Sequence, residues 1–253
     1  MAKQIVESRV EEVFAQAAAL DQAGRLRSTI YCLGRKVYIL NQDLTVLIQF
    51  RLRERQAFSA PFSFRANDYD SKEFQEEDGR IEFVKREGQW KSVKSCSTPN
   101  RTPADVEQLF RSFDFPEVNP VTIGQDVLPL LDESLSHIEV SAKRGKLRIV
   151  QRNIYDGSVL RISMEEARQT LGALEAELPD FGPLGLRTND FIALYTFVSH
   201  LSWRFAPDVA WFESPDPAYR MRGLISQCVY DELGRIENGW QEPKERKREQ
   251  SAD

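Results

Sequence analysis

Apolar positions recur every three or four residues near the start of the chain, and the positions between them are mostly polar. This spacing places the apolar side chains on one face of a helix. Gly24 follows the last of these positions, and glycine commonly ends a helix. The sequence therefore predicts an amphipathic helix over 6–22, with an apolar face made of Val6, Val10, Val13, Phe14, Ala17 and Leu20.

Three strand-like runs come next, at 25–33, 36–40 and 45–52, and they are rich in β-branched and aromatic residues. The short sequences between them, at 34–35 and 41–43, are typical of tight turns. Consecutive strands joined by such turns usually pair with one another. The sequence therefore predicts a helix followed by an antiparallel meander.

The patterns between residues 54 and 96 are weaker. A short strand is expected at 61–65, followed by a polar stretch. A hairpin is expected next, formed by 80–86 and 89–96 and joined at Glu87 and Gly88.

A stretch with four prolines, 97–120, separates the chain into two halves. It also carries the spacing of a short helix, through Val106, Leu109 and Phe110. The last residues of the chain are too polar to fold by themselves. The expected N-terminal domain, interdomain connector, C-terminal domain and disordered tail are 1–100, 101–118, 119–233 and 234–253.

From residue 119 onward, a strand, a helix and three strands occur twice in the same order, joined by a helical segment at 164–178. Shifting the chain by 63 positions superposes the two sets without a gap from 121 to 140, and His137 then falls on His200. The sequence predicts an internal duplication. The expected elements are 119–123, 126–134, 136–142, 146–152 and 158–164, and then 183–187, 190–199, 201–206, 209–214 and 219–226.

His137 and His200 are the only two histidines in the chain. Neither has a cysteine or a second histidine at a spacing typical of metal binding, although Asp132 and Glu133 precede the first. We expect them to be structural residues at equivalent junctions rather than one catalytic or metal-binding pair.

Composition narrows the class of protein. A chain of 253 residues with 41% hydrophobic residues can bury a substantial core. Its three cysteines are far apart and form no CxxC motif, which argues against a disulfide framework or a zinc site. No run approaches the roughly 18 apolar residues of a membrane span. We expect a soluble protein, cytosolic in a bacterial, phage or archaeal host or nuclear in a eukaryote.

The sequence holds no phosphate-binding glycine loop and no nucleophile elbow. Acidic clusters occur at 73–79 and at 165–167, but they lie in polar segments where a solvated face is the ordinary explanation. We therefore expect no enzymatic activity, no cofactor and no bound metal.

Basic residues gather at 143–152, although the net charge of the chain is −5. In a strand with alternating faces, Lys146 and Arg148 lie on one side, where they would contact phosphates. A solvated strand face is the alternative interpretation.

The repeated order of strand, helix and three strands resembles the trimeric sliding DNA clamps, the polymerase processivity factors of eukaryotes, archaea and phages. The likeness lies in 121–163 and 184–233. In the first half, 3–7 would be the opening strand and 6–53 the rest of one unit, and the second unit is eroded. The resemblance implies an α+β fold with outer antiparallel sheets and inner helices, and a homotrimeric ring closed by pairing of edge strands.

In such clamps the helices line a central hole and contact the backbone of double-stranded DNA. The resemblance implies DNA-binding residues at Lys3, Arg9, Lys143, Arg144, Lys146, Arg148 and Arg187. The expected helices carry few basic residues, and 126–134 carries none. A clamp-derived scaffold that binds protein rather than DNA is therefore the alternative.

The second functional surface of the family is a hydrophobic pocket beneath the interdomain connector, where partner proteins dock a short peptide. The matching residues are Phe115 and Val118 in the connector, and Val229 and Tyr230 near the end of the C-terminal domain. Ordinary core packing at a domain boundary is the alternative. The function implied is a processivity factor that encircles DNA, is opened by a clamp loader and tethers a DNA polymerase.

Overall fold

The computed structural model describes most of the chain. The described residues are 3–52, 57–58, 60–69, 74–77, 80–83, 101–144, 146–152, 159–162, 180–206, 208–215 and 220–227. The helical segment expected at 164–178, the strand at 89–96, and the residues from 228 onward lie outside this set.

The first helix, α1, spans Lys3–Gln22 and begins before the predicted start at residue 6. The prediction of an opening strand at 3–7 is wrong, because these residues form the first turns of α1. An isolated strand needs a paired neighbour, whereas a helix satisfies its backbone groups within the segment. The helical spacing of Val6 and Val10 extends across this region and favours the helix.

The predicted meander is confirmed as β1 (Ser28–Leu33), β2 (Lys36–Asn41) and β3 (Val46–Arg51), paired in sequence order. The edge strand β5 (Phe62–Arg65) pairs with β1 on its other side, and the short helix η1 (Ala66–Asp68) follows it.

A separate small sheet has the strand order β4 (Ala57–Phe58), β7 (Arg80–Phe83) and β6 (Phe74–Glu77). The sequence predicted a hairpin between β7 and a later strand. In the structure β7 pairs with β6, which precedes it and comes from the acidic cluster expected to be a solvated segment, whereas the second strand of the predicted hairpin, 89–96, lies outside the described residues.

The second half of the chain begins with the connector helix α2 (Pro103–Arg111). The remaining elements follow in two sets. The first is β8 (Val121–Gly124), η3 (Gln125–Leu130), β9 (His137–Lys143), β10 (Lys146–Arg152) and β11 (Val159–Ile162); the second is β12 (Phe181–Arg187), α4 (Thr188–Leu194), β13 (His200–Phe205), β14 (Val209–Glu213) and β15 (Met221–Ser226).

Two of the expected helices differ from the prediction. The segment expected as a helix at 126–134 is the short 3-10 helix η3, which contains Pro129. Proline has no N–H to donate, and its ring clashes with the preceding turn, so an α-helix does not propagate there. Helix α4 ends at Leu194 rather than at residue 199, because the backbone N–H groups of Tyr195, Thr196 and Phe197 donate to carbonyls three positions earlier, as in tight turns that lead into β13.

The two sets exchange their first strands. Strand β8 pairs with β13, and β12 pairs with β9. The registers of these two pairings are related by the same 63-residue step: Leu201 lies opposite Ile123, and Ile138 lies opposite Leu186. The same step relates two backbone hydrogen bonds, Gln125 N to Ser199 O at 2.8 Å and Thr188 N to Ser136 O at 3.0 Å.

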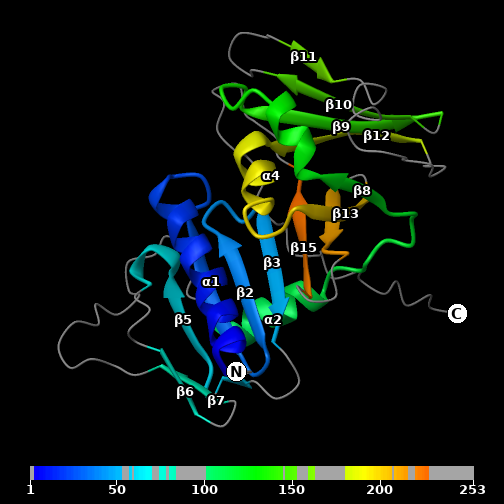
Figure 1. The fold of residues 1–253 in the computed structure, drawn as a ribbon. Coiled ribbons are helices and arrows are strands. Elements are labelled where there is room, and N and C mark those ends of the chain that lie inside the picture. The colour runs from blue at the N-terminus through cyan, green and yellow to red at the C-terminus, as the bar shows by residue number, and fades with distance from the viewer. Residues whose placement is uncertain are drawn as a thin grey trace, which may run out of the picture.

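One continuous sheet of eight strands joins the two halves (Figure 1), in the order β5-β1-β2-β3-β15-β14-β13-β8. The halves meet where β3 pairs with β15 in antiparallel fashion, and Leu47 lies opposite Leu224. We call this pair of strands the seam. A second sheet, of four strands, has the order β11-β10-β9-β12.

Helices cover both faces of the eight-stranded sheet. Alternate residues of β2 show the division: Val37 and Ile39 join the main hydrophobic core with α1 and α4, whereas Tyr38 and Leu40 join a second cluster with α2. The α+β class expected from the sequence is confirmed. The sheet is buried on both faces at the seam, and this fixes the position of the candidate site.

Candidate functional site

The connector helix α2 is specified locally by its own sequence. The side chain of Thr102 accepts a hydrogen bond from the backbone N–H of Asp105, while the Asp105 carboxylate accepts one from the backbone N–H of Thr102 at 2.7 Å. Pro103 occupies the first turn, where its missing N–H has no cost. This capping box fixes the start of a nine-residue helix.

The helix buries one stripe, Val106, Leu109 and Phe110, against the face of the sheet opposite α1. We call the resulting group the connector cluster. Its members come from β1, β2, β3, α2, β14 and β15, so it spans the seam. They are Tyr31, Tyr38, Leu40, Leu47, Val106, Leu109, Phe110, Trp211 and Leu224.

Trp211 is the centre of the aromatic contacts in this cluster. The ring centroids of Phe110, Phe113 and Phe115 lie 5.9, 6.5 and 5.1 Å from its own, in edge-to-face arrangements. Such aromatic pairs contribute beyond the area that they bury. The connector is therefore anchored to β14 by three aromatic residues in succession.

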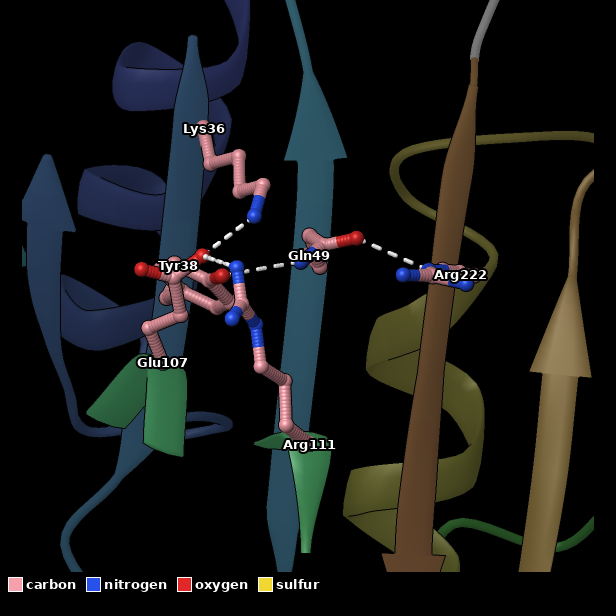
Figure 2. A network of polar contacts seen from close by, with 6 residues as sticks. All are labelled: Lys36, Tyr38, Gln49, Glu107, Arg111 and Arg222. Atoms are coloured by element: carbon pink, nitrogen blue, oxygen red, sulfur yellow. Dashed lines mark hydrogen bonds and ion pairs between the residues drawn. The ribbon is translucent and has the colours of Figure 1, made fainter. Parts of the chain in front are cut away.

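A polar network borders the connector cluster and crosses the seam (Figure 2). Gln49 of β3 donates from its amide nitrogen to the hydroxyl of Tyr38 at 2.9 Å, and its amide oxygen accepts from Nε of Arg222 at 2.8 Å. The guanidinium of Arg222 lies 5.1 Å from the ring centroid of Phe110. Side chains of β2, β3, β15 and α2 are thereby linked.

Glu107 connects α2 to the edge of the same network. Its carboxylate accepts from the ammonium of Lys36 and from Arg111, the latter at 2.8 Å. The hydrogen bond from Lys36 holds the pKa of Glu107 below its ordinary value, whereas burial raises the pKa of Tyr38 to about 12. The carboxyl of Glu107 is therefore ionised, and the hydroxyl of Tyr38 is neutral, over a wide range of pH around 7.

The polar residues of this network were not predicted from the sequence. Only the apolar stripe of α2, which packs beside the network, was predicted. Lys36 and Glu107 are 71 positions apart, and Gln49 and Arg222 are 173 positions apart. The spacing of Val106, Leu109 and Phe110 predicted the helix α2, but nothing in that spacing indicated which strands the helix would cover.

Two of the four predicted partner-binding residues belong to the described structure. Phe115 is one of two exposed large hydrophobic residues in the described part of the chain, with 37% of its surface accessible. The guanidinium of Arg204 lies 4.5 Å from its ring centroid and also donates to Glu213 at 2.6 Å. Val118 is half-buried, and Val229 and Tyr230 lie outside the described residues.

A second polar group lies at the seam on the opposite face of the sheet. The hydroxyl of Thr45 donates to the carboxylate of Asp190 on α4 at 2.6 Å, and the amide of Asn41 donates to the same hydroxyl at 2.7 Å. Asp190 is almost fully buried, and this burial raises its pKa to about 6, although the nearby Arg187 acts in the opposite direction.

The predicted DNA-binding residues are spread over α1, β9, β10, β12 and the turn between β9 and β10. Arg187 forms an ion pair with Asp43 across the two halves. Lys3 and Arg9 belong to α1, but their side chains are not described. The remaining four, Lys143, Arg144, Lys146 and Arg148, surround the turn between β9 and β10.

Lys143 and Arg148 are exposed on the face of the four-stranded sheet that points away from the core. Arg148 is exposed and lies opposite Ser141, whereas Val140 and Ile149 of the same strands are buried in the main core with α4. Residues 10–22 of α1, η3 and α4 contain no lysine or arginine. The surfaces of these three helix segments are therefore neutral or acidic.

His137 and His200 belong to different sheets at positions related by the 63-residue step. His137 is buried in β9, and His200 is exposed in β13, where its Nδ1 lies 2.9 Å from the hydroxyl of Ser199. Within the described ranges, no group of three His, Cys, Asp or Glu side chains is placed to hold a metal ion. None of the helices in these ranges has the length and apolar character to cross a membrane.

Comparison with known proteins gives structural similarity only. No family model matches the sequence, and no curated protein matches it either. The fold is similar to the beta clamp of H. pylori in complex with 5-chloroisatin, with 13% identity and a TM-score of 0.49, over 86% of this chain and 63% of that one.

Two further solved structures are similar to the same extent. DNA polymerase III subunit beta of Borrelia burgdorferi has 12% identity and a TM-score of 0.49, over 89% of this chain and 62% of that one. The DNA polymerase sliding clamp of Bacillus subtilis has 10% identity and a TM-score of 0.49, over 90% and 63%. These three solved structures are bacterial sliding-clamp or DNA polymerase III beta subunits, and the chain spans about 63% of their length.

Proposed function

We propose that this protein is a non-enzymatic, sliding-clamp-like platform that surrounds double-stranded DNA and tethers a DNA polymerase or another DNA enzyme. The proposal rests on the order in which the strands of the two sheets are paired. Two units exchange their first strands at the same register, and the eight-stranded sheet continues from one half into the other at the seam. In this proposal the halves are two domains, 1–100 and 119–233, joined by a connector at 101–118.

In the described part of the chain, the edge of one sheet is formed by a strand that holds the same place in its unit as β3 holds at the seam. Strand β3 is the last strand of its unit and pairs with β15. Strand β11 is the last strand of the unit that begins at β8, and it forms an edge of the four-stranded sheet. Edge strands expose unpaired backbone groups that favour pairing with another chain, and a closed ring removes such edges. A homo-oligomeric ring, trimeric in our proposal, would use this edge.

A closed ring acts by topology rather than by sequence recognition. It keeps a bound enzyme near the template and so raises the effective concentration of that enzyme. We propose Lys143, Arg144, Lys146 and Arg148 as sequence-independent contacts to DNA phosphates, together with Lys3, Arg9 and Arg187. The docking surface for the enzyme is the connector cluster and its exposed edge at Phe115, with Val118, Val229 and Tyr230 as further contacts.

A second function is favoured by the charge of the helices. The described surfaces of α1, η3 and α4 carry no basic residue, whereas non-specific DNA binding depends on lysine and arginine contacts to phosphates. The alternative is therefore a clamp-derived scaffold that uses the same connector surface for proteins and does not bind DNA.

Two measurements distinguish these functions. The first is the oligomeric mass by light scattering, for which the clamp requires a ring of several copies. The second is retention on nicked circular and on linear DNA after a rise in salt, because a closed ring slides off a linear molecule but stays on a circle. A strict monomer that ignores both DNAs overturns the clamp function, and an oligomer that ignores both supports the scaffold.

A charge variant refines the DNA measurement. Changing Lys143 and Arg148 together to glutamate should reduce retention on circular DNA at least tenfold if these residues contact phosphates. Arg27→Glu, at an exposed position before β1, is the matched control and should leave retention unchanged.

A further inference from the structure

The connector cluster exists only because α2 covers the sheet. Without α2 the seam would present a continuous apolar face drawn from five strands of both halves. The side chains of that face are Tyr31, Tyr38, Leu40, Leu47, Trp211 and Leu224. An exposed patch of this kind is typical of a docking site for another protein.

The contacts that hold α2 in place are few. The helix has nine residues and buries three side chains, at one stripe of i, i+3 and i+4 positions. Isolated helices of this length are marginal in water, so the helical state of α2 depends on its docking. Its polar link to the sheet, from Glu107 to Lys36, lies at the partly exposed rim, with side-chain exposures of 19% and 27%.

We propose that α2 is a built-in occupant of the docking face, and that a short amphipathic helix of a partner protein competes with it for the same surface. This inference rests on the proposed function, because it concerns the surface through which the platform would tether an enzyme. It adds regulation: the surface is closed in the free protein, and binding requires the release of α2.

The surface that α2 covers defines the chemistry of the partner segment. The face accepts an apolar residue, a leucine three positions later and an aromatic ring immediately after it, as Val106, Leu109 and Phe110 show. The aromatic ring lies beneath the guanidinium of Arg222, and the Lys36 ammonium requires an acidic residue next to the first apolar position. The partner segment is therefore an acidic, aromatic, amphipathic helix.

A synthetic peptide with the sequence of residues 101–115 tests the proposal, because it has the required chemistry and is available without knowledge of the partner. Binding of the fluorescently labelled peptide is measured by anisotropy with three proteins. They are the unaltered chain, a variant with Glu107→Gln and Phe110→Ala that loosens α2, and Gln108→Ala, which changes an exposed position of the same helix.

The loosened variant should bind the peptide at least about tenfold more tightly than the unaltered chain does, because a tethered α2 acts at an effective concentration in the millimolar range. Gln108→Ala should behave as the unaltered chain. Equal affinity for all three proteins, or no binding to a loosened variant that retains its circular dichroism spectrum, would overturn the proposal.

Hydrogen exchange supplies a measurement that needs no substitution. Excess peptide added to the unaltered chain should accelerate exchange of the amides at 106–111 and leave those of β2 and β3 unchanged. Binding of the peptide without faster exchange in α2 would place it elsewhere and refute the competition. Neither measurement uses DNA, so a failure of DNA retention would overturn the clamp function and leave this result standing.

Discussion

The ring of Phe212 on β14 lies against the backbone of Gly223 on β15, at a distance that leaves no room for a side chain. A Cβ at Gly223 would be 2.4 Å from Cζ of Phe212 and 2.5 Å from the carbonyl oxygen of Leu47 across the seam. Glycine at this position lets β3, β15 and β14 come together beneath a fully buried aromatic ring.

Gly223→Ala should therefore destabilise the fold. Phe212 or the backbone of β3 must move, and overpacking of this kind costs about 1–3 kcal/mol. The free energy of unfolding from urea titration measures the effect. Gly24→Ala is the control, because nothing lies within 4 Å of a Cβ there and only the positive φ of 69° opposes it. A cost at Gly223 no larger than the cost at Gly24 would contradict the packing argument.

Asp190 should make stability depend on pH between about 4 and 6.5. Burial raises its folded-state pKa to about 6, from about 3.9 in an unfolded chain. The folded state therefore binds a proton more tightly, and the unfolding free energy falls as pH rises through this window, by on the order of 3 kcal/mol at most.

Asp190→Asn keeps an acceptor for the hydroxyl of Thr45 and removes the ionisable group. The pH dependence of the unfolding free energy should flatten between pH 4 and 6.5, and stability at pH 8 should rise. Asp208→Asn changes an exposed aspartate and should leave the profile unaltered. An unchanged slope in Asp190→Asn would show that Asp190 does not titrate in this range.

The capping box of α2 should contribute measurably to its docking. Thr102→Ala removes the side chain that accepts from the N–H of Asp105, and loss of such a cap costs about 1 kcal/mol. Faster hydrogen exchange at 106–111 is the expected result. Thr122→Ala, on the edge strand β8, serves as the matched control, and equal exchange in the two variants would argue against a role for the cap.

The ion pair between Lys36 and Glu107 should couple α2 to β2. In a double-mutant cycle with Lys36→Met and Glu107→Met, we expect a coupling energy of about 0.5–1 kcal/mol at pH 7, because both side chains are only partly buried. The pKa of Glu107 is lowered, so this stabilisation is present above its unfolded-state pKa and is lost as pH falls through the folded-state value. A coupling that persists at pH 2 would contradict an ionic origin.

Predictions from the sequence were reliable wherever a local pattern was sufficient. The β-branched and aromatic runs between 25 and 52 predicted the three strands of the meander, and the stripe at Val106, Leu109 and Phe110 predicted α2. The predictions failed where local signals competed. A strand was expected at 3–7 and an α-helix across Pro129, but residues 3–7 form the first turns of α1, and the missing proline N–H prevents an α-helix at 126–134.

The sequence by itself determined most of the strands and the helix α2, the 63-residue relation between Val121 and Leu184, and the interpretation of His137 and His200 as one position occurring twice. Only the tertiary structure decided that the repeated units exchange strands, that β3 pairs with β15, and that α2 covers Trp211. Periodicity reports which side of an element is buried, because burial requires only a local apolar face. It contains no information on which distant face covers it, since that choice depends on packing between residues that are far apart in the sequence.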